Sequence, residues 1–272
     1  MRALETEGLS ERGACTLLRC PRRTVQYKPL KPDDSAVRER LRHHAHKRVR
    51  FGWRRLRILL RREGILMNHK RLRRIYREER LQVRPRKKRR VRLVRGNVAP
   101  VPTMLNEEWG LDFMEERLLT RRKVRVLTIE DRLSREGFAV DADFSLTSRR
   151  VIRALEAIAA VHGYPKRLRV DNGPENTAGA MLTWSVEHNV ELHFIDPGKP
   201  AQNAWIESFN ARVRDEFLNT QAFWTLYELR EAAETWLVDY NEVRPHSSLA
   251  YLTPKEFVET LTTTPIPQLP AA

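Results

Sequence analysis

The hydrophobic periodicity of residues 107–218 constrains the fold of this 272-residue chain more than any other feature. Three segments with alternating apolar residues come first: "EEWGLDFMEE", "KVRVLTIED" and "EGFAVDADF". Short connections join them, which predicts an antiparallel meander. A helix is then expected over about 148–162, followed by a strand "RLRV", a helix near 178–188, a strand "VELHFI" and a long helix over about 203–218.

The resulting order, βββαβαβα, predicts an α/β fold. Three antiparallel strands that continue into helix-connected parallel strands form an RNase H-like mixed sheet, with helices on both faces. The preceding residues indicate a small, basic all-α region. Residues 8–27 carry a weak helix-turn-helix pattern, and residues 35–80 predict two or three basic helices, with Gly64 between the last two and Asn68 as an N-cap.

These patterns divide the chain into five segments. We predict a helix-turn-helix remnant over 1–30, a basic helical DNA-binding module over 31–83, and a basic, Pro-rich linker over 84–104. The RNase H-like core is expected over 105–222. A C-terminal helix and tail, 223–272, are expected to pack on that core.

The charge of +16 is divided unevenly along the chain. Residues 1–100 hold 32 Lys and Arg against 9 Asp and Glu, whereas the remainder holds 19 against 26. A nucleic acid is the expected partner, because Lys and Arg release counterions from phosphates. A bundle with merely solvated arginines is the alternative. A membrane surface is disfavoured, since the basic stretches lack an aromatic face, and without a long apolar run or signal peptide the protein is expected in the cytoplasm.

Three acidic residues occupy informative places in the predicted sheet. Asp112 lies within the first strand, and Asp171 ends the fourth strand before an Asn-Gly-Pro turn, where open α/β sheets present their sites. Glu207 flanks the apolar stripe of the last helix. Three converging carboxylates would repel one another unless Mg²⁺ or Mn²⁺ neutralised them, and two such ions serve in-line phosphoryl transfer.

Each of these acids also has a simpler interpretation as a solvated strand, turn or helix-surface residue, so their joint placement carries the hypothesis. Asp141 and Asp143 are expected to face solvent, and Glu130 and Asp131 are weaker candidates. A zinc site formed by Cys15, Cys20 and the "HHAH" run at 43–46 is disfavoured, because the spacing fits no known finger.

Four motifs together resemble one protein family: "WGLDFM", "VDNGPEN", "PGKPAQNAWIESFNARVRDEFLN" and "DYNEVRPHSSLAYLTPKEF". They resemble the OrfB transposases of the IS-three insertion-sequence family, within the retroviral integrase superfamily, over roughly residues 35–260. Asp112, Asp171 and Glu207 match the DDE triad of that family, with 35 residues between the last two acids. Two letters depart from its pattern, since Asn176 and Trp205 stand where Phe is usual.

The resemblance implies cleavage of insertion-sequence DNA ends and joining of the freed 3′ hydroxyl to target DNA, with two Mg²⁺ or Mn²⁺ ions and no covalent enzyme intermediate. It also implies a homo-oligomer on DNA at the bacterial nucleoid, and fusion with or dependence on an upstream OrfA product. From the resemblance and the basic runs we predict DNA contacts at Arg214, Lys199, Asn210, Arg54, Arg55, Arg73, Arg74, Lys87, Lys88, Arg89 and Arg90.

Two alternatives to transposition stay open. One is a metal-dependent nuclease of the same fold that performs no strand transfer. The other is a DNA-binding regulator or inactive element remnant. In "RPHSSL", Arg244 and His246 are candidates either for DNA contact or for a structural role.

Overall fold

The computed structural model describes residues 8, 10–26, 33–83, 102–196 and 203–263, and the chain divides into two compact units, 1–40 and 41–272. The first unit contains the short helices α2 (Glu11–Leu17) and α3 (Arg22–Gln26). Ser10 caps α2 by accepting a hydrogen bond from the Gly13 N–H at 3.2 Å. Ala14 is buried, whereas Leu17, three residues further along α2, is 66% exposed.

Three helices follow, in the region where two or three were predicted: α4 (Ser35–Lys47), α5 (Trp53–Arg62) and α6 (His69–Glu78). The boundary between the two units falls within α4. Gly64 has a φ of +82°, which ends α5, and Asn68 caps α6 by accepting from the Lys70 N–H at 2.8 Å. Both helix signals in the sequence are therefore confirmed.

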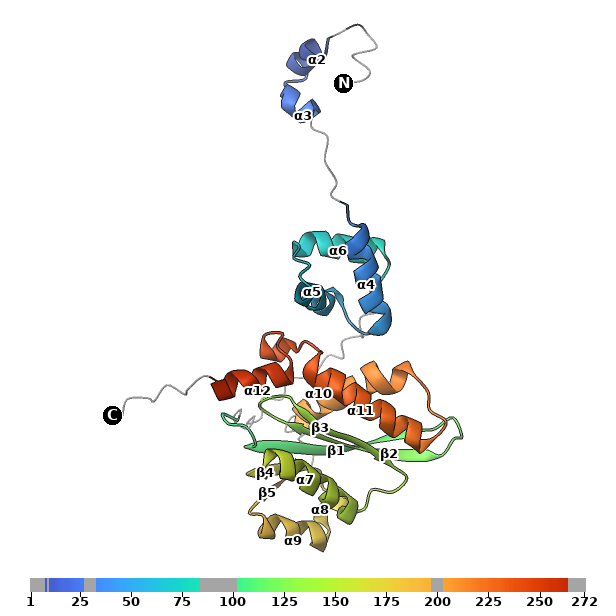
Figure 1. The fold of residues 1–272 in the computed structure, drawn as a ribbon, viewed down its shortest axis with the longest axis vertical. Coiled ribbons are helices and arrows are strands. Elements are labelled where there is room, and N and C mark those ends of the chain that lie inside the picture. Colours follow the sequence, from blue (N-terminus) through green and yellow to red (C-terminus); the bar gives the residue numbers. More distant parts are fainter. Residues whose placement is uncertain (1–7, 9, 27–32, 84–101, 197–202, 264–272) are drawn as a thin grey trace, which may run out of the picture. The chain divides into compact units, whose positions relative to one another are not determined.

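The second unit contains a five-stranded mixed sheet in the order β3-β2-β1-β4-β5 (Figure 1). Its strands are β1 (Glu108–Arg117), β2 (Lys123–Asp131), β3 (Gly137–Asp143), β4 (Arg167–Val170) and β5 (Glu191–Phe194). The first three are antiparallel neighbours, whereas β4 is parallel to β1 and β5 is parallel to β4. The predicted meander and its parallel continuation are both confirmed.

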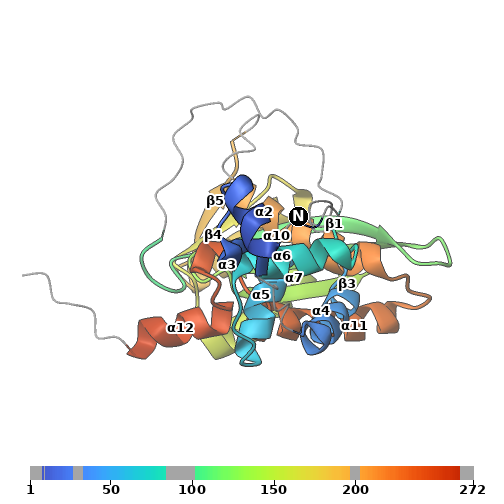
Figure 2. The ribbon, with the colours of Figure 1, turned by 90° about the horizontal axis from the view of Figure 1, so that it is seen from above.

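Helices cover both faces of this sheet, as predicted (Figure 1). On one face lie α7 (Ser148–His162), α8 (Pro174–Thr177) and α9 (Gly179–Glu187). On the other face lie α10 (Ala204–Arg212) and α11 (Leu226–Glu242), and α11 packs along β3 (Figure 2). The helix α12 (Pro254–Thr263) ends the described part of the chain, and none of the helices described is long and apolar enough to cross a membrane.

Alternation along β1 separates two hydrophobic cores. Trp109 and Leu111 point to the α7 side, where they pack with Leu127 and Leu155. On the opposite face α10 contributes Ile206 and Phe209, and the turn that follows it contributes Val213 and Phe217, to a core shared with β2, β3 and α11. This face also receives every second residue of β1, namely Glu108, Gly110 and Asp112.

The helix predicted over about 203–218 is not uniformly α-helical. After α10 the chain forms a π-helical turn over Val213–Phe217 and a 3₁₀ turn over Leu218–Thr220. In the π turn Glu216 binds the buried guanidinium of Arg244 through two hydrogen bonds of 2.6 and 2.7 Å and accepts a third from Arg55 at 3.0 Å. Distant ion partners therefore hold a wider turn that local periodicity does not indicate.

A fully buried acid, Glu130, lies near the end of β2. Tyr240 of α11 donates its hydroxyl to Glu130 Oε1 at 3.0 Å. Burial raises the pKa of the Glu130 carboxyl from 4.5 to about 7, although the charges of Arg135 and Arg212 oppose the shift. Folded protein therefore holds this proton more tightly than unfolded protein, so the stability it contributes below about pH 4.5 is lost as pH rises towards 7.

We expect Glu130→Gln to flatten this pH dependence. The amide oxygen still accepts from Tyr240, but the side chain no longer titrates. Between pH 4.5 and pH 8 the free energy of unfolding of the variant should therefore fall by about 3 kcal/mol less than that of the wild type. Urea unfolding at both pH values, followed by circular dichroism, measures the difference. Equal pH slopes for the two proteins would contradict the assignment.

Candidate active site

The register between β1 and β4 places two predicted site residues side by side. Trp109 pairs with Leu168 and Gly110 with Arg169 in the parallel ladder. Continuing this register by two residues brings Asp112 level with Asp171, the residue directly after β4. Both alternate onto the α10 face, because Leu111 and Val170 point to the opposite core.

Gly110 sets the approach of α10 to this pair. A Cβ atom built on Gly110 would lie 2.3 Å from the Trp205 ring, so the indole packs directly against the β1 backbone. Trp205 belongs to the first turn of α10, and Glu207 follows two residues later. The absence of a side chain at Gly110 thus lets α10 lie close enough for Glu207 to influence Asp112.

Asp112 is half-buried and firmly bonded. Its Oδ1 accepts the Phe113 N–H at 2.8 Å, and its Oδ2 accepts Asn210 Nδ2 at 2.7 Å. Burial raises the pKa of Asp112 to about 6, the Phe113 hydrogen bond lowers it, and the charges of Asp171 and Glu207 raise it further. The three predicted carboxylates therefore share one electrostatic environment.

Thr128 fixes the orientation of the amide that holds Asp112. It lies directly opposite Asp112 in the antiparallel β1–β2 ladder and is fully buried. Its hydroxyl oxygen is 2.7 Å from Asn210 Oδ1 and 3.1 Å from the Asp112 carbonyl oxygen, and both of these are acceptors. A hydroxyl donor on Oδ1 directs the Asn210 NH₂ group towards the carboxylate.

Asp171 is held by the turn that follows it. Its Oδ1 accepts the Gly173 N–H at 3.0 Å and Asn176 Nδ2 at 2.7 Å. The neighbouring Asn172 donates Nδ2 to the Ile195 carbonyl at 2.9 Å, which ties the turn to the end of β5. Glu175 forms an ion pair with Arg125 of β2, which fastens α8 to the sheet.

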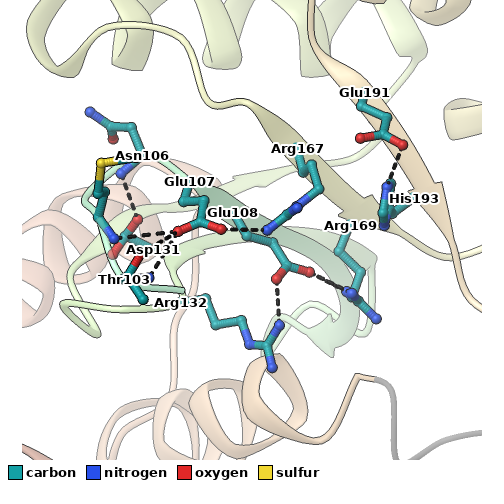
Figure 3. Close-up of polar contacts among 11 residues, drawn as sticks. Thr103, Asn106, Glu107, Glu108, Asp131, Arg132, Arg167, Arg169, Glu191 and His193 are labelled. Atoms are coloured by element: carbon teal, nitrogen blue, oxygen red, sulfur yellow. Dashed lines mark hydrogen bonds and ion pairs between the residues drawn. The ribbon is translucent and has the colours of Figure 1, made fainter. Parts of the chain in front are cut away.

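A buried ion cluster stabilises the β1–β4 register four residues before Asp112. Glu108, 1% exposed, lies between the guanidinium groups of Arg132 and Arg169 (Figure 3). Arg169 donates from Nε to Glu108 Oε1 at 2.6 Å, and Arg167, two residues earlier in β4, donates to Glu107 Oε1 at 2.8 Å. These bonds join β1 to β4 where the pairing begins, so they support the alignment of Asp112 with Asp171.

The site fits a divalent cation through hard oxygen donors. In the described ranges no three His, Cys, Asp or Glu side chains are placed to hold one ion together. Mg²⁺ needs only one or two protein carboxylates, because water and phosphate complete its shell. Asp112 and Asp171 satisfy this requirement, and a bound cation would neutralise the repulsion that Asp171 and Glu207 add to the effect of burial on the pKa of Asp112.

Similarity to known proteins agrees with this geometry. Residues 102–200 and 188–254 match the integrase core domain, and residues 32–89 match an HTH-like domain. The 31.7 kDa protein of insertion element IS407 from Burkholderia multivorans is 43% identical over 255 residues, which cover 93% of this chain and 92% of that protein. The chain belongs to the insertion-sequence transposases with an integrase core.

A second relative agrees with this family assignment, and a solved structure shares the fold. The putative transposase InsK of IS150 from Escherichia coli is 29% identical, and the alignment covers 87% of this chain and 89% of InsK. The fold resembles the simian T-cell lymphotropic virus intasome in complex with the PP2A regulatory subunit B56 gamma, with a TM-score of 0.54, 16% identity, and coverage of 86% of this chain and 78% of that one. The family is one of DNA-processing enzymes, and its HTH-like and integrase domains support DNA binding.

The residues predicted to contact DNA differ in their surroundings in this transposase-family chain. Arg54 and Arg73 are exposed, and Arg74 is exposed beside Glu78 at 3.0 Å. Arg214 donates to Glu116 Oε2 at 3.0 Å and to the Glu115 carbonyl at 2.7 Å. Five candidates lie outside the described residues: Lys87, Lys88, Arg89, Arg90 and Lys199.

Asn210 and Arg55 both have hydrogen-bond or ion partners within the protein. Asn210 is 9% exposed, and both ends of its amide are bonded within the protein, to Asp112 and Thr128. Its helix, α10, packs against β1 and β2. Arg55 is paired with the largely buried Glu216 in the π turn. Both side chains are therefore engaged by internal partners, and DNA contact by either of them stays a prediction.

The remaining candidates are also occupied by internal contacts. Arg244 is 2% exposed. Burial of the His246 ring, together with the nearby charge of Arg244, lowers the pKa of His246 to about 2, so His246 is neutral. This burial favours the structural role for the "RPHSSL" motif. Asp143, expected to face solvent, forms ion pairs of 3.0 Å with Arg150 and with Arg230. Asp141 lies in the same partly buried cluster, while Glu130 and Asp131 are buried.

The sequence did not indicate how three residues organise the site: Gly110 by close packing, and Thr128 and Asn176 by hydrogen bonds. An isolated Gly within a strand pattern is a signal for close backbone approach, so Gly110 could have been recognised. Thr128 had no such signal, because only the strand register places it opposite Asp112. Asn176 was visible only as a departure from the family motif.

Proposed function

We propose that this chain is a transposase that cuts insertion-sequence DNA ends and joins the freed 3′ hydroxyl to target DNA, with Asp112, Asp171 and Glu207 as its catalytic residues. The observation that carries this proposal is the β1–β4 register, which aligns the two aspartates on the face that α10 covers. The shared electrostatic environment of the three acids supports it.

Asp112 and Asp171 would hold one Mg²⁺ or Mn²⁺ ion, and Glu207 would complete the site for a second. Bound divalent ions would supply charge neutralisation for the phosphodiester and activation of the attacking oxygen. The chain contributes orientation. Asn210 and the Phe113 N–H fix the Asp112 carboxylate, while Gly173 and Asn176 fix that of Asp171. Glu207, which is exposed, faces the solvent from which DNA would enter.

The DNA partner would be bound outside the catalytic centre by the basic helical module. Arg54 and Arg73 expose their guanidinium groups there, and the basic run that includes Lys87 and Arg90 extends the charge in sequence. Two element ends must be processed together for insertion, which favours a homo-oligomer on DNA. Dependence on an upstream OrfA product, and action at the nucleoid, belong to the same proposal.

A strand-transfer assay tests this function. Purified full-length chain is incubated with Mg²⁺, a labelled double-stranded element end and a supercoiled target plasmid, alone and fused to the product of its upstream reading frame. Labelled DNA covalently joined to plasmid is the expected result. Nicked end DNA without joining would favour the nuclease, and retarded but uncut DNA would favour the regulator or inactive remnant. Either of these outcomes would overturn transposition.

A further inference from the structure

Asn176 contacts the second catalytic aspartate directly. It belongs to α8, the short helix that follows the turn after β4, and is 0% exposed. Its Nδ2 donates to Asp171 Oδ1 at 2.7 Å and lies 3.4 Å from the Asp171 carbonyl oxygen. Since the Gly173 N–H reaches the same Oδ1, two donors converge on one carboxylate oxygen. Within the described residues, no hydrogen bond or ion pair reaches Oδ2 of this carboxylate.

The Asn176 side chain occupies this position at a cost. Its Oδ1 is buried and has no hydrogen-bond partner in the described part of the chain. An unpaired buried carbonyl is unfavourable, and a Leu of nearly the same shape would avoid it. Packing alone therefore does not favour Asn at this site. The interaction that the Asn176 amide makes and a Leu would lack is the hydrogen bond to Asp171.

The first aspartate has an equivalent partner. Asn210 donates Nδ2 to Asp112 Oδ2 at 2.7 Å, the same length as the Asn176 bond to Asp171. A backbone N–H supplies the second donor in both cases, from Phe113 for Asp112 and from Gly173 for Asp171. Each aspartate is thus held by one backbone donor and one side-chain amide, but these reach different oxygens of Asp112 and the same oxygen of Asp171.

We propose that Asn176 is a positioning residue for cation binding. By occupying Oδ1, it holds the Asp171 carboxylate in one rotamer and leaves Oδ2 for the ion, so that less side-chain freedom is lost when the ion binds. This inference rests on the proposed function, because it takes Asp171 to be a cation ligand. Partners that orient a ligand in this way are worth about 10- to 100-fold in metal affinity.

The test measures Mn²⁺ binding to the full-length chain by electron paramagnetic resonance of the free ion, together with thermal unfolding. Asn176→Leu removes the donor and the unpaired carbonyl at nearly constant volume. We expect Mn²⁺ affinity to fall by about 10-fold, with a melting temperature equal to or above that of the wild type. Asn176→Ala, which only shortens the side chain, should weaken binding in the same direction and is the measurement used if the Leu variant does not fold.

Two reference variants separate the possible causes of a result. Asn172→Ala breaks the neighbouring tether to Ile195 without touching the Asp171 carboxylate, and wild-type affinity is expected. Asp171→Asn should lose Mn²⁺ binding. If Asp171→Asn does so while both Asn176 variants bind as the wild type does, the positioning role is refuted and the carboxylate site stands. If Asp171→Asn retains wild-type affinity, the proposed site fails and the role of Asn176 fails with it.

Discussion

Replacing Asp171 with Asn is expected to reduce metal-dependent cleavage of element-end DNA by on the order of 10³-fold or more, while DNA binding stays at the wild-type level. A cation contributes several kcal/mol of charge stabilisation to a phosphoryl-transfer transition state, and each 1.4 kcal/mol corresponds to about tenfold in rate. The amide keeps the shape of the carboxylate but removes the charge that would hold the ion. Single-turnover cleavage and gel-shift binding on the same labelled end measure the two properties.

Asp141→Asn is the matched control for this variant. Asp141 is also an aspartate of the sheet, but it lies on β3 beside Arg150, at 3.4 Å, and away from the β1–β4 alignment. A partly exposed ion pair contributes about 1 kcal/mol, which corresponds to roughly fivefold in rate. The Asp141→Asn variant should therefore change the cleavage rate by less than this factor. Cleavage by Asp171→Asn at the rate of the control would show that the catalytic centre lies elsewhere.

Gly110→Ala should disrupt the same site through packing. The added methyl would lie 2.3 Å from one Trp205 ring carbon and 2.6 Å from another, so the indole and the first turn of α10 must move away from β1. Overpacking of this kind costs about 1 to 3 kcal/mol of stability. Because Glu207 follows Trp205 in α10, its carboxylate moves with the turn, and we expect cleavage to fall by about 100-fold, as displacements of about 1 Å can cause.

The double variant Gly110→Ala, Trp205→Phe distinguishes displacement from general unfolding. Phe lacks the outer ring atoms that the new methyl would meet, so it should restore most of the melting temperature and a large part of the cleavage rate. Trp205→Phe alone supplies the baseline for the smaller ring. If the double variant is no more active than Gly110→Ala, close packing of Trp205 on Gly110 does not control the position of Glu207.

Most elements of the core could be predicted because their periodicity is local. The helix over 148–162 and the strand "RLRV" are found at the predicted residues. In both, the spacing of the apolar residues within one short segment indicates the element. The π turn after α10 could not be predicted in this way. It depends on Glu216 meeting Arg244 and Arg55, which are distant in sequence, so no window of local sequence contains its cause.

The candidate site divides along the same line. The identities of Asp112, Asp171 and Glu207 follow from motifs, because each acid stands in a distinctive run of residues. The contacts that neighbouring side chains make with these acids do not follow from the motifs. Asn210 was predicted to contact DNA, and the motif that names it does not indicate that its amide also donates to Asp112. Arg214 is likewise engaged within the protein, because its guanidinium donates to Glu116 of β1.

By itself the sequence determined the order of strands and helices, the division between a basic N-terminal third and an acidic remainder, and the three candidate acids. These properties are encoded in local periodicity, composition and short motifs. Only the tertiary structure decided which side chains orient those acids: Thr128 through strand register, Asn210 through helix approach and Asn176 through the turn after β4. Such bonds depend on ångström-scale distances between separate elements, and those distances exist only once the sheet and its covering helices have packed.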